Sequence, residues 1–114
     1  MLNKDLTQFD IKEGRVSFEI KKAQIHWQDS KLSRLVRLTQ NGNFILLDKT
    51  ETNKLKFSYL DIEIGKADLE IETEGLLENQ DYLFILSWSA QNRIIRLYIN
   101  GTLKGTQQIV SIEQ

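Results

Sequence analysis

The chain carries few side chains that could act as a nucleophile or as a metal ligand. His26 is the only histidine among 114 residues, and cysteine is absent. A thiolate nucleophile, a disulfide and a metal site built from several histidines or thiolates are therefore excluded. A serine–histidine–acid triad would have to use His26, whose polar surroundings, AQIHWQDSKLS, predict an ordinary surface histidine instead.

Two aromatic side chains stand where they could meet a ligand. Trp27 follows His26 in a polar connection, and Tyr98 alternates with apolar residues in the segment RIIRLYIN. An exposed ring can stack on a sugar or a peptide, and polar neighbours can orient the ligand. The alternatives are that Trp27 caps the edge of the fold and that Tyr98 belongs to a solvated sheet face. The candidate ligand-binding residues are Trp27, Tyr98, Arg96, His26 and Asp29.

The elements that must position these residues are strands. Val16, Phe18 and Ile20 alternate with polar residues, as expected for a strand with one buried face, and residues 54–59 repeat the pattern. The segment YLFILSWS, residues 82–89, is apolar on both faces at its start, which predicts a central strand. Helical spacing is scarce, and turn residues separate the runs. The pattern predicts one domain, residues 1–114, folded as an antiparallel β-sandwich of roughly 8 to 10 strands with little or no helix.

The apolar positions change parity between Tyr59 and Leu60. Leu55, Phe57 and Tyr59 occupy odd positions, whereas the next apolar run occupies even ones. A β-bulge, or a strand that crosses between sheets, would produce this change. We therefore predict a kink at Tyr59 and Leu60.

Two Asn-Gly dipeptides mark hairpins. A two-residue loop at Asn100-Gly101 would place Lys104 among inward apolar side chains, because cross-strand partners share a face. A three-residue loop would instead pair Leu97 with Leu103 and give both faces a consistent character. The same reasoning applies to the first hairpin, so the predicted loops are residues 40–42 and 99–101.

Composition limits the partners. The net charge is −1, from 15 basic and 16 acidic residues, so no excess positive field exists to hold a nucleic-acid backbone. Hydrophobic residues make up 40% and charged residues 27%, which is ordinary for a globular domain and gives no reason to expect a membrane partner. The segment MLNKDLTQFDIKEG lacks the apolar run of a signal peptide. We expect either a cytoplasmic protein or a domain cut from a longer, secreted chain.

Three segments together resemble a known family. They are FDIKEGRVSFEI at residues 9–20, a middle GNFILLD followed by KLKFSYL, and a late YLFILSWSAQNRIIRLYINGTLKG. In this order they resemble the concanavalin A-like jelly roll, in particular the laminin G-like group, which typically ends with a strand reading L-Y-V-[DN]-G. The resemblance implies a short jelly-roll variant. Calcium is implied by the resemblance alone, and from the residues themselves we expect no cofactor and no metal.

The same fold hosts retaining glycoside hydrolases, whose catalytic strand carries E-x-D-x-E. Two carboxylates about 5 Å apart act there as nucleophile and as acid/base. In YLDIE, Asp61 and Glu63 match the last two positions, but Tyr59 stands in place of the nucleophile, and a phenol has a reference pKa of about 10. The stretch EIETE, residues 70–74, has glutamate where the pattern needs aspartate. Both stretches also fit solvated strand faces, so we predict no catalysis.

These observations favour a non-catalytic binding module on a concanavalin A-like β-sandwich, with a carbohydrate as one candidate ligand. The alternative is a structural or protein-interaction domain that assembles with another protein or with copies of itself. A glycoside hydrolase-like enzyme is a distant third.

Overall fold

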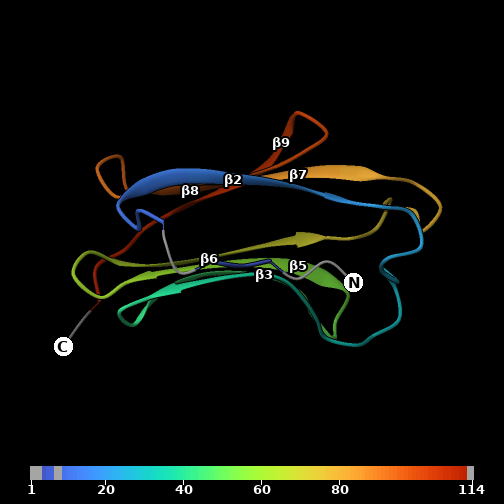
Figure 1. The fold of residues 1–114 in the computed structure, drawn as a ribbon, viewed down its shortest axis with the longest axis horizontal. Helices are drawn as coiled ribbons and strands as arrows, with labels where there is room; N and C mark the ends of the chain where they lie inside the picture. Colours follow the sequence, from blue (N-terminus) through green and yellow to red (C-terminus); the bar gives the residue numbers. More distant parts are fainter. Residues whose placement is uncertain (1–3, 7–8, 113–114) are drawn as a thin grey trace.

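Two β-sheets packed face to face make up the molecule (Figure 1). The computed structural model describes residues 4–6 and 9–112. The strands in this part of the chain are β1 (Lys4–Leu6), β2 (Glu13–Ile20), β3 (Ser33–Gln40), β4 (Asn43–Lys49), β5 (Lys54–Asp61), β6 (Gly65–Glu72), β7 (Tyr82–Ser89), β8 (Ile94–Ile99) and β9 (Thr102–Gln108). The described residues contain no helix, so the predicted all-β sandwich is confirmed.

The chain crosses between the sheets and returns. One sheet has the order β1-β3-β4-β5-β6, and the other has the order β2-β7-β8-β9. After β2, the segment 21–32 leads to the other sheet, where β3 to β6 form an antiparallel meander. Residues 73–81 lead back to β7, which pairs antiparallel with both β2 and β8. The prediction that residues 82–89 form a central strand is confirmed.

The core lies between the inner faces of the two sheets. Along β7 every second side chain is buried, because successive side chains of a strand point to opposite faces. Phe84 stacks on Phe18 of β2 with ring centroids 5.5 Å apart. From the five-stranded sheet, Leu47 and Phe57 are fully buried on the facing side. This packing fixes which side chains of the four-stranded sheet face outward.

Both Asn-Gly hairpins have two-residue loops, so the predicted three-residue loops are wrong. Ile99 pairs with Thr102, and Gln40 pairs with Asn43. Asn100 and Gly101 have φ angles of 51° and 81°, the left-handed pair that a type I′ turn requires.

A β-bulge resolves the conflict over Lys104. Tyr98 pairs with Leu103, but the next pair is Leu97 with Gly105, so Lys104 is an extra residue in β9. Because Lys104 is this extra residue, it stays exposed, and it does not have to share a face with the inward apolar side chains of β8. A similar register shift lies in β3 between Arg34 and Val36.

The predicted kink at Tyr59 and Leu60 is also wrong. β5 pairs with β4 and with β6 without a register shift up to Asp61. Leu60 is a half-buried residue of β5, which ends at Asp61, and Ile62, which is 59% exposed, lies in the turn to β6, so the apolar parity changes without a bulge.

The C-terminal segment ties the two sheets together. After β9, Val110 and Lys66 of β6 exchange two backbone hydrogen bonds of 2.9 Å. A Cβ at Gly65 would collide with the carbonyl of Val110, so only glycine permits this close approach. The segment therefore covers the start of the β6 edge.

Candidate functional site

Trp27 belongs to the core, so its prediction as an exposed platform is wrong. The side chain is 1% exposed. Its ring stacks on Phe84 at 6.0 Å and meets Tyr82 edge to face at 6.1 Å. Ile25 is also buried while His26 and Gln28 are exposed, so the connection places alternate side chains between the sheets. The apolar residues at positions 25 and 27 were the signal that could have revealed this.

His26 and Asp29 interact within the protein. His26 Nδ1 lies 2.9 Å from Glu78 Oε1 in an exposed pair. Asp29 accepts a hydrogen bond from Lys49 Nζ, and the lysine side chain is fully buried. This bond, together with one from the backbone N–H of Lys31, holds the pKa of Asp29 below its usual value. The carboxylate of Asp29 therefore compensates the positive charge of the buried Lys49.

Tyr98 and Arg96 lie on the outer side of the four-stranded sheet. Both alternate with the buried Ile95 and Leu97, as the sequence predicted. Trp27 packs on the inner side of the same sheet, against Phe84. The sheet therefore separates Tyr98 from Trp27, and the five candidate residues do not form one site.

Strand pairing gathers a different set around Tyr98 and Arg96. Arg15 pairs with Ser87, and Ser87 pairs with Arg96, so their side chains form a row across β2, β7 and β8. In the next row, Ile85 pairs with Tyr98. We call Arg15, Ile85, Ser87, Arg96 and Tyr98 the arginine–tyrosine face. Sequence reasoning missed Arg15, Ile85 and Ser87, because only the long-range pairing of β2 with β7 brings them there.

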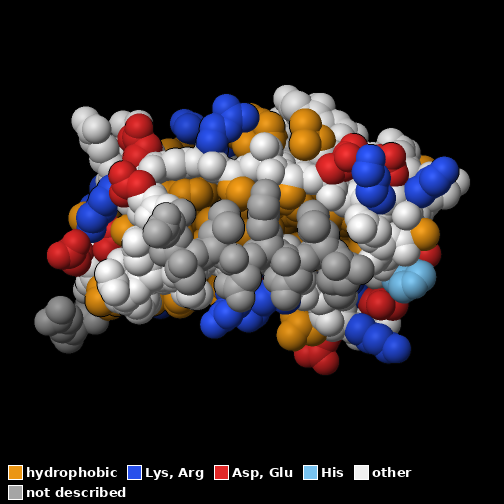
Figure 2. Space-filling model, viewed as in Figure 1, with side chains coloured by type: hydrophobic (Ala, Val, Ile, Leu, Met, Phe, Trp, Pro, Cys, Tyr) orange, Lys and Arg blue, Asp and Glu red, His pale blue; other side chains and the backbone are white. Residues whose placement is uncertain are grey.

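Two shallow cavities cover the arginine–tyrosine face. The first has a volume of about 370 Å³ and is lined by Arg15, Ile85, Ser87, Tyr98 and Gly101. The second, of about 360 Å³, shares Arg15 and Ser87 and extends to Arg96 and Glu13. Viewed from the side, basic side chains stand next to hydrophobic ones on the layer that contains this sheet (Figure 2). A hollow of this kind can hold a small ligand between cations and an aromatic ring.

The charges on the two outer faces differ. Within residues 9–112, neither Arg15 nor Arg96 forms an ion pair, and Glu13, the acid beside them, interacts with Ser89 Oγ at 3.3 Å. On the outer face of the other sheet, Arg34 Nε bonds to Asp48 Oδ1 at 2.8 Å. The five-stranded sheet thus pairs an outward arginine internally, whereas the arginine–tyrosine face leaves its arginines available.

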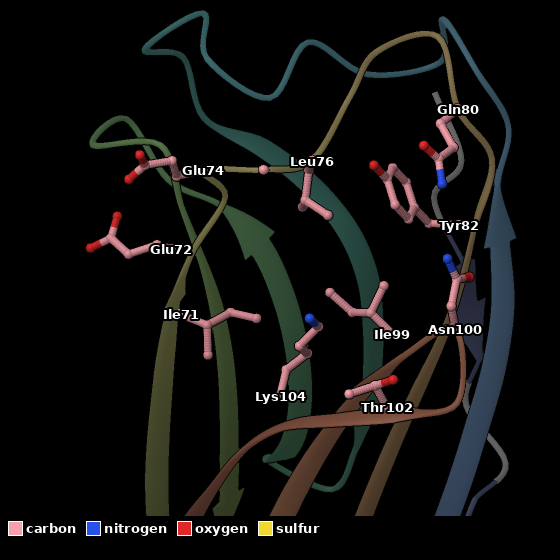
Figure 3. Close-up of a pocket in the computed structure, with 11 residues that line it drawn as sticks. Ile71, Glu72, Glu74, Leu76, Gln80, Tyr82, Ile99, Asn100, Thr102 and Lys104 are labelled. Atoms are coloured by element: carbon pink, nitrogen blue, oxygen red, sulfur yellow. The ribbon is translucent and has the colours of Figure 1, made fainter.

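A further cavity, of about 480 Å³, lies between β6 and the β8–β9 hairpin (Figure 3). Ile71, Leu76 and Ile99 give it an apolar floor. Glu72 and Glu74 stand on one side of the opening and Lys104 comes from β9 (Figure 3). Lys54 Nζ lies 3.8 Å from Glu72 Oε1, so this carboxylate already has a cation beside it. No local sequence pattern indicates this cleft, because it depends on how the edges of the two sheets approach each other.

The residues of YLDIE meet one lysine instead of forming a carboxylate pair. Lys12 Nζ lies 2.6 Å from Asp61 Oδ2 and 2.9 Å from Glu63 Oε1, and these bonds raise the pKa of Lys12. Asp61 is fully buried, whereas Glu63 is exposed in the turn. Tyr59 donates a hydrogen bond to the carbonyl of Ile11, and burial raises its pKa to about 12. In the part of the chain that is described, no three histidine, cysteine, aspartate or glutamate side chains gather as metal ligands would.

No family model, no curated protein and no solved structure matches this chain. Residues 4–6 and 9–112 include no helix long and apolar enough to cross a membrane.

Proposed function

We propose that the protein is a non-catalytic binding module that holds a carbohydrate on the arginine–tyrosine face. The observation that carries this proposal is a half-buried aromatic ring, Tyr98, in a shallow cavity beside the side chains of Ser87 and Arg15. Sugars are recognised by stacking on an aromatic ring combined with a few directed hydrogen bonds.

The resemblance to the concanavalin A-like jelly roll, and to its laminin G-like group, supports the same proposal. A fold alone does not determine a function, so the proposal rests on the face and not on the resemblance. Ile85 and Tyr98 are cross-strand partners on β7 and β8, so the pairing of these strands places the two side chains next to each other on this face.

A glycan array followed by calorimetry with the best ligand tests the proposal. The Tyr98→Ala variant should lose detectable binding while its melting temperature changes little, because the ring is only half-buried. Phe44→Ala is the matched control, since Phe44 is a half-buried aromatic residue on the other sheet, and it should bind like the wild type. Unchanged binding by Tyr98→Ala would rule out this site.

The second candidate is a protein-interaction or oligomerisation domain. It is favoured by two exposed leucines beside the same face, Leu83 at 43% and Leu103 at 47%. Light scattering coupled to gel filtration tests this candidate. An oligomer that Leu83→Ser dissociates, but Leu32→Ser does not, would favour it over the carbohydrate module; Leu32 is a suitable control because it is an exposed leucine in the segment between β2 and β3.

A further inference from the structure

We propose that the ligand of the arginine–tyrosine face is an acidic sugar, whose carboxylate or sulfate group binds between Arg15 and Arg96. This inference rests on the proposed carbohydrate function and adds the chemical class of the ligand. The selectivity of the face comes from charge, which the two arginines carry.

The register places the two arginines on either side of one hydroxyl. Arg15 and Arg96 are both cross-strand partners of Ser87, from opposite sides. Neighbouring strands lie about 4.8 Å apart, so the two arginine Cα atoms are about 10 Å apart. Side chains as long as arginine can close that distance from both sides over the hydroxyl of Ser87. A guanidinium offers two parallel N–H donors, which match the two oxygens of a carboxylate or a sulfate.

Charge complementarity identifies the kind of group that fits. No described carboxylate pairs with Arg15 or Arg96, and Glu13, which lines the same cavity, is engaged with Ser89. Arg96 is half-buried, and its positive charge has no ion-pair partner among the described residues. An anionic ligand would supply that compensation, and a neutral sugar would not.

The neighbouring row explains why the anion should belong to a sugar. Arg96 and Tyr98 are two residues apart on β8, which corresponds to about 7 Å along the strand. One sugar unit is long enough to place its acidic group on the arginine row and the C–H groups of its ring on Tyr98. Ile85, the cross-strand partner of Tyr98, extends the apolar part of this surface.

Calorimetry with three tetrasaccharides tests the inference: a uronic-acid oligomer, a sulfated galactose oligomer and a neutral galactose oligomer. We expect at least one acidic oligomer to bind about tenfold or more tightly than the neutral one, because hydrogen bonds between charged groups are the stronger ones. The two acidic oligomers distinguish a carboxylate from a sulfate. Added sodium chloride should weaken the acidic ligand more than the neutral one.

Three variants test whether the preference for the acidic oligomer depends on the two arginines. Arg15→Gln and Arg96→Gln should each lower the affinity for the acidic oligomer by about tenfold or more. Lys56→Gln is the matched control, because it removes one positive charge from β5 of the other sheet. The cross-strand partners of Lys56 are Asp48 and Glu70. The affinity of this variant should stay within about twofold of that of the wild type. A loss of affinity in Lys56→Gln equal to that in the arginine variants would overturn the inference, because only net charge would then matter.

The remaining outcomes separate this inference from the proposed function. Equal affinity for acidic and neutral oligomers, with binding still lost in Tyr98→Ala, would overturn the acidic class and leave the carbohydrate module intact. Binding of a polyglutamate peptide that depends on Arg15 and Arg96, with no oligosaccharide bound, would overturn both in favour of an acidic protein partner. Failure of all four probes to bind would overturn the acidic class, and the carbohydrate module would then be accepted or rejected on the glycan array.

Discussion

At the scale of single residues, burial decides what an aromatic side chain can do. Trp27 is next to an exposed histidine in sequence, yet it stacks on Phe84 inside the sandwich. A ring of this size gains several kcal/mol when it leaves water. The connection 21–32 therefore has to follow the end of the core, although its polar residues suggest a solvent-exposed loop.

Replacement of Trp27 by alanine tests this role. Because the ring is 1% exposed, Trp27→Ala should lower the free energy of unfolding by about 3–5 kcal/mol through lost packing and a residual cavity. Urea unfolding measures the change. His26→Ala, at the exposed neighbouring position, should stay within about 0.5 kcal/mol of the wild type. Equal stability of the two variants would mean that the ring lies outside the core.

The phenol of Tyr59 should ionise at a higher pH than an ordinary tyrosine, and the fold should lose stability as it does so. Burial raises its pKa to about 12, so the folded state holds this proton more tightly than the unfolded chain, where the pKa is about 10. Its contribution to stability is complete below about pH 10 and is lost as the pH rises towards 12. Absorbance at the tyrosinate band should show one tyrosine that ionises late, and Tyr59→Phe should remove that step. A late step that persists in Tyr59→Phe would assign it to another tyrosine.

At the scale of elements, alternation predicted the strands well but not their pairing. The two-fold period identified residues 82–89 as a central strand and turned Arg96 and Tyr98 outward, as the structure has them. The length of the Asn100-Gly101 loop could not be inferred in this way. A two-residue loop alone would turn Lys104 inward, but the bulge in β9 adds one unpaired residue and keeps the apolar side chains on the same face. Arg15 and Ser87 reach Arg96 only through the pairing of β2 with β7, which no local pattern contains.

The Asn100-Gly101 turn is held by more than its own backbone. Asn100 Oδ1 accepts a hydrogen bond from the N–H of Leu83, and the N–H of Asn100 donates to the carbonyl of Leu83, both at 2.8 Å. The turn is therefore fastened to β7 as well as to its own hairpin. Asparagine and glycine both accept the positive φ that this turn needs, and the asparagine also supplies the side-chain acceptor for the N–H of Leu83.

Replacement of Gly101 by valine should destabilise the protein by about 1–2 kcal/mol, because a β-branched residue resists the left-handed conformation. A Cβ at Gly101 would have no atom within 4 Å, so the cost would come from the backbone alone. Thermal unfolding measures it, with Thr102→Val as the control in the adjacent extended strand. If both valine variants melt together, the positive φ at Gly101 does not constrain the turn.

At the scale of the whole molecule, each outer face has its own character. The five-stranded sheet carries the internal pair of Arg34 with Asp48, whereas the four-stranded sheet presents the arginine–tyrosine face. The bridge between Lys66 and Val110 joins the two layers beside the start of β6. The outer face of the four-stranded sheet therefore belongs to a layer that is tied to the other sheet. Its two arginines have no ion-pair partner among the described residues.

The pairing of β2 with β7 should also limit the rate at which the protein folds. It joins Glu13 to Ser89, 76 positions apart, and the five-stranded sheet contains most of the chain between them. Such distant contacts slow folding to the millisecond-to-second range, because the chain loses entropy before the contacts form. The sequence has no proline, so refolding should lack the phase of tens of seconds that proline isomerisation causes. Stopped-flow tryptophan fluorescence should thus record one exponential in that range; a microsecond process or a slow second phase would show that the closure of β2 on β7 does not limit the rate.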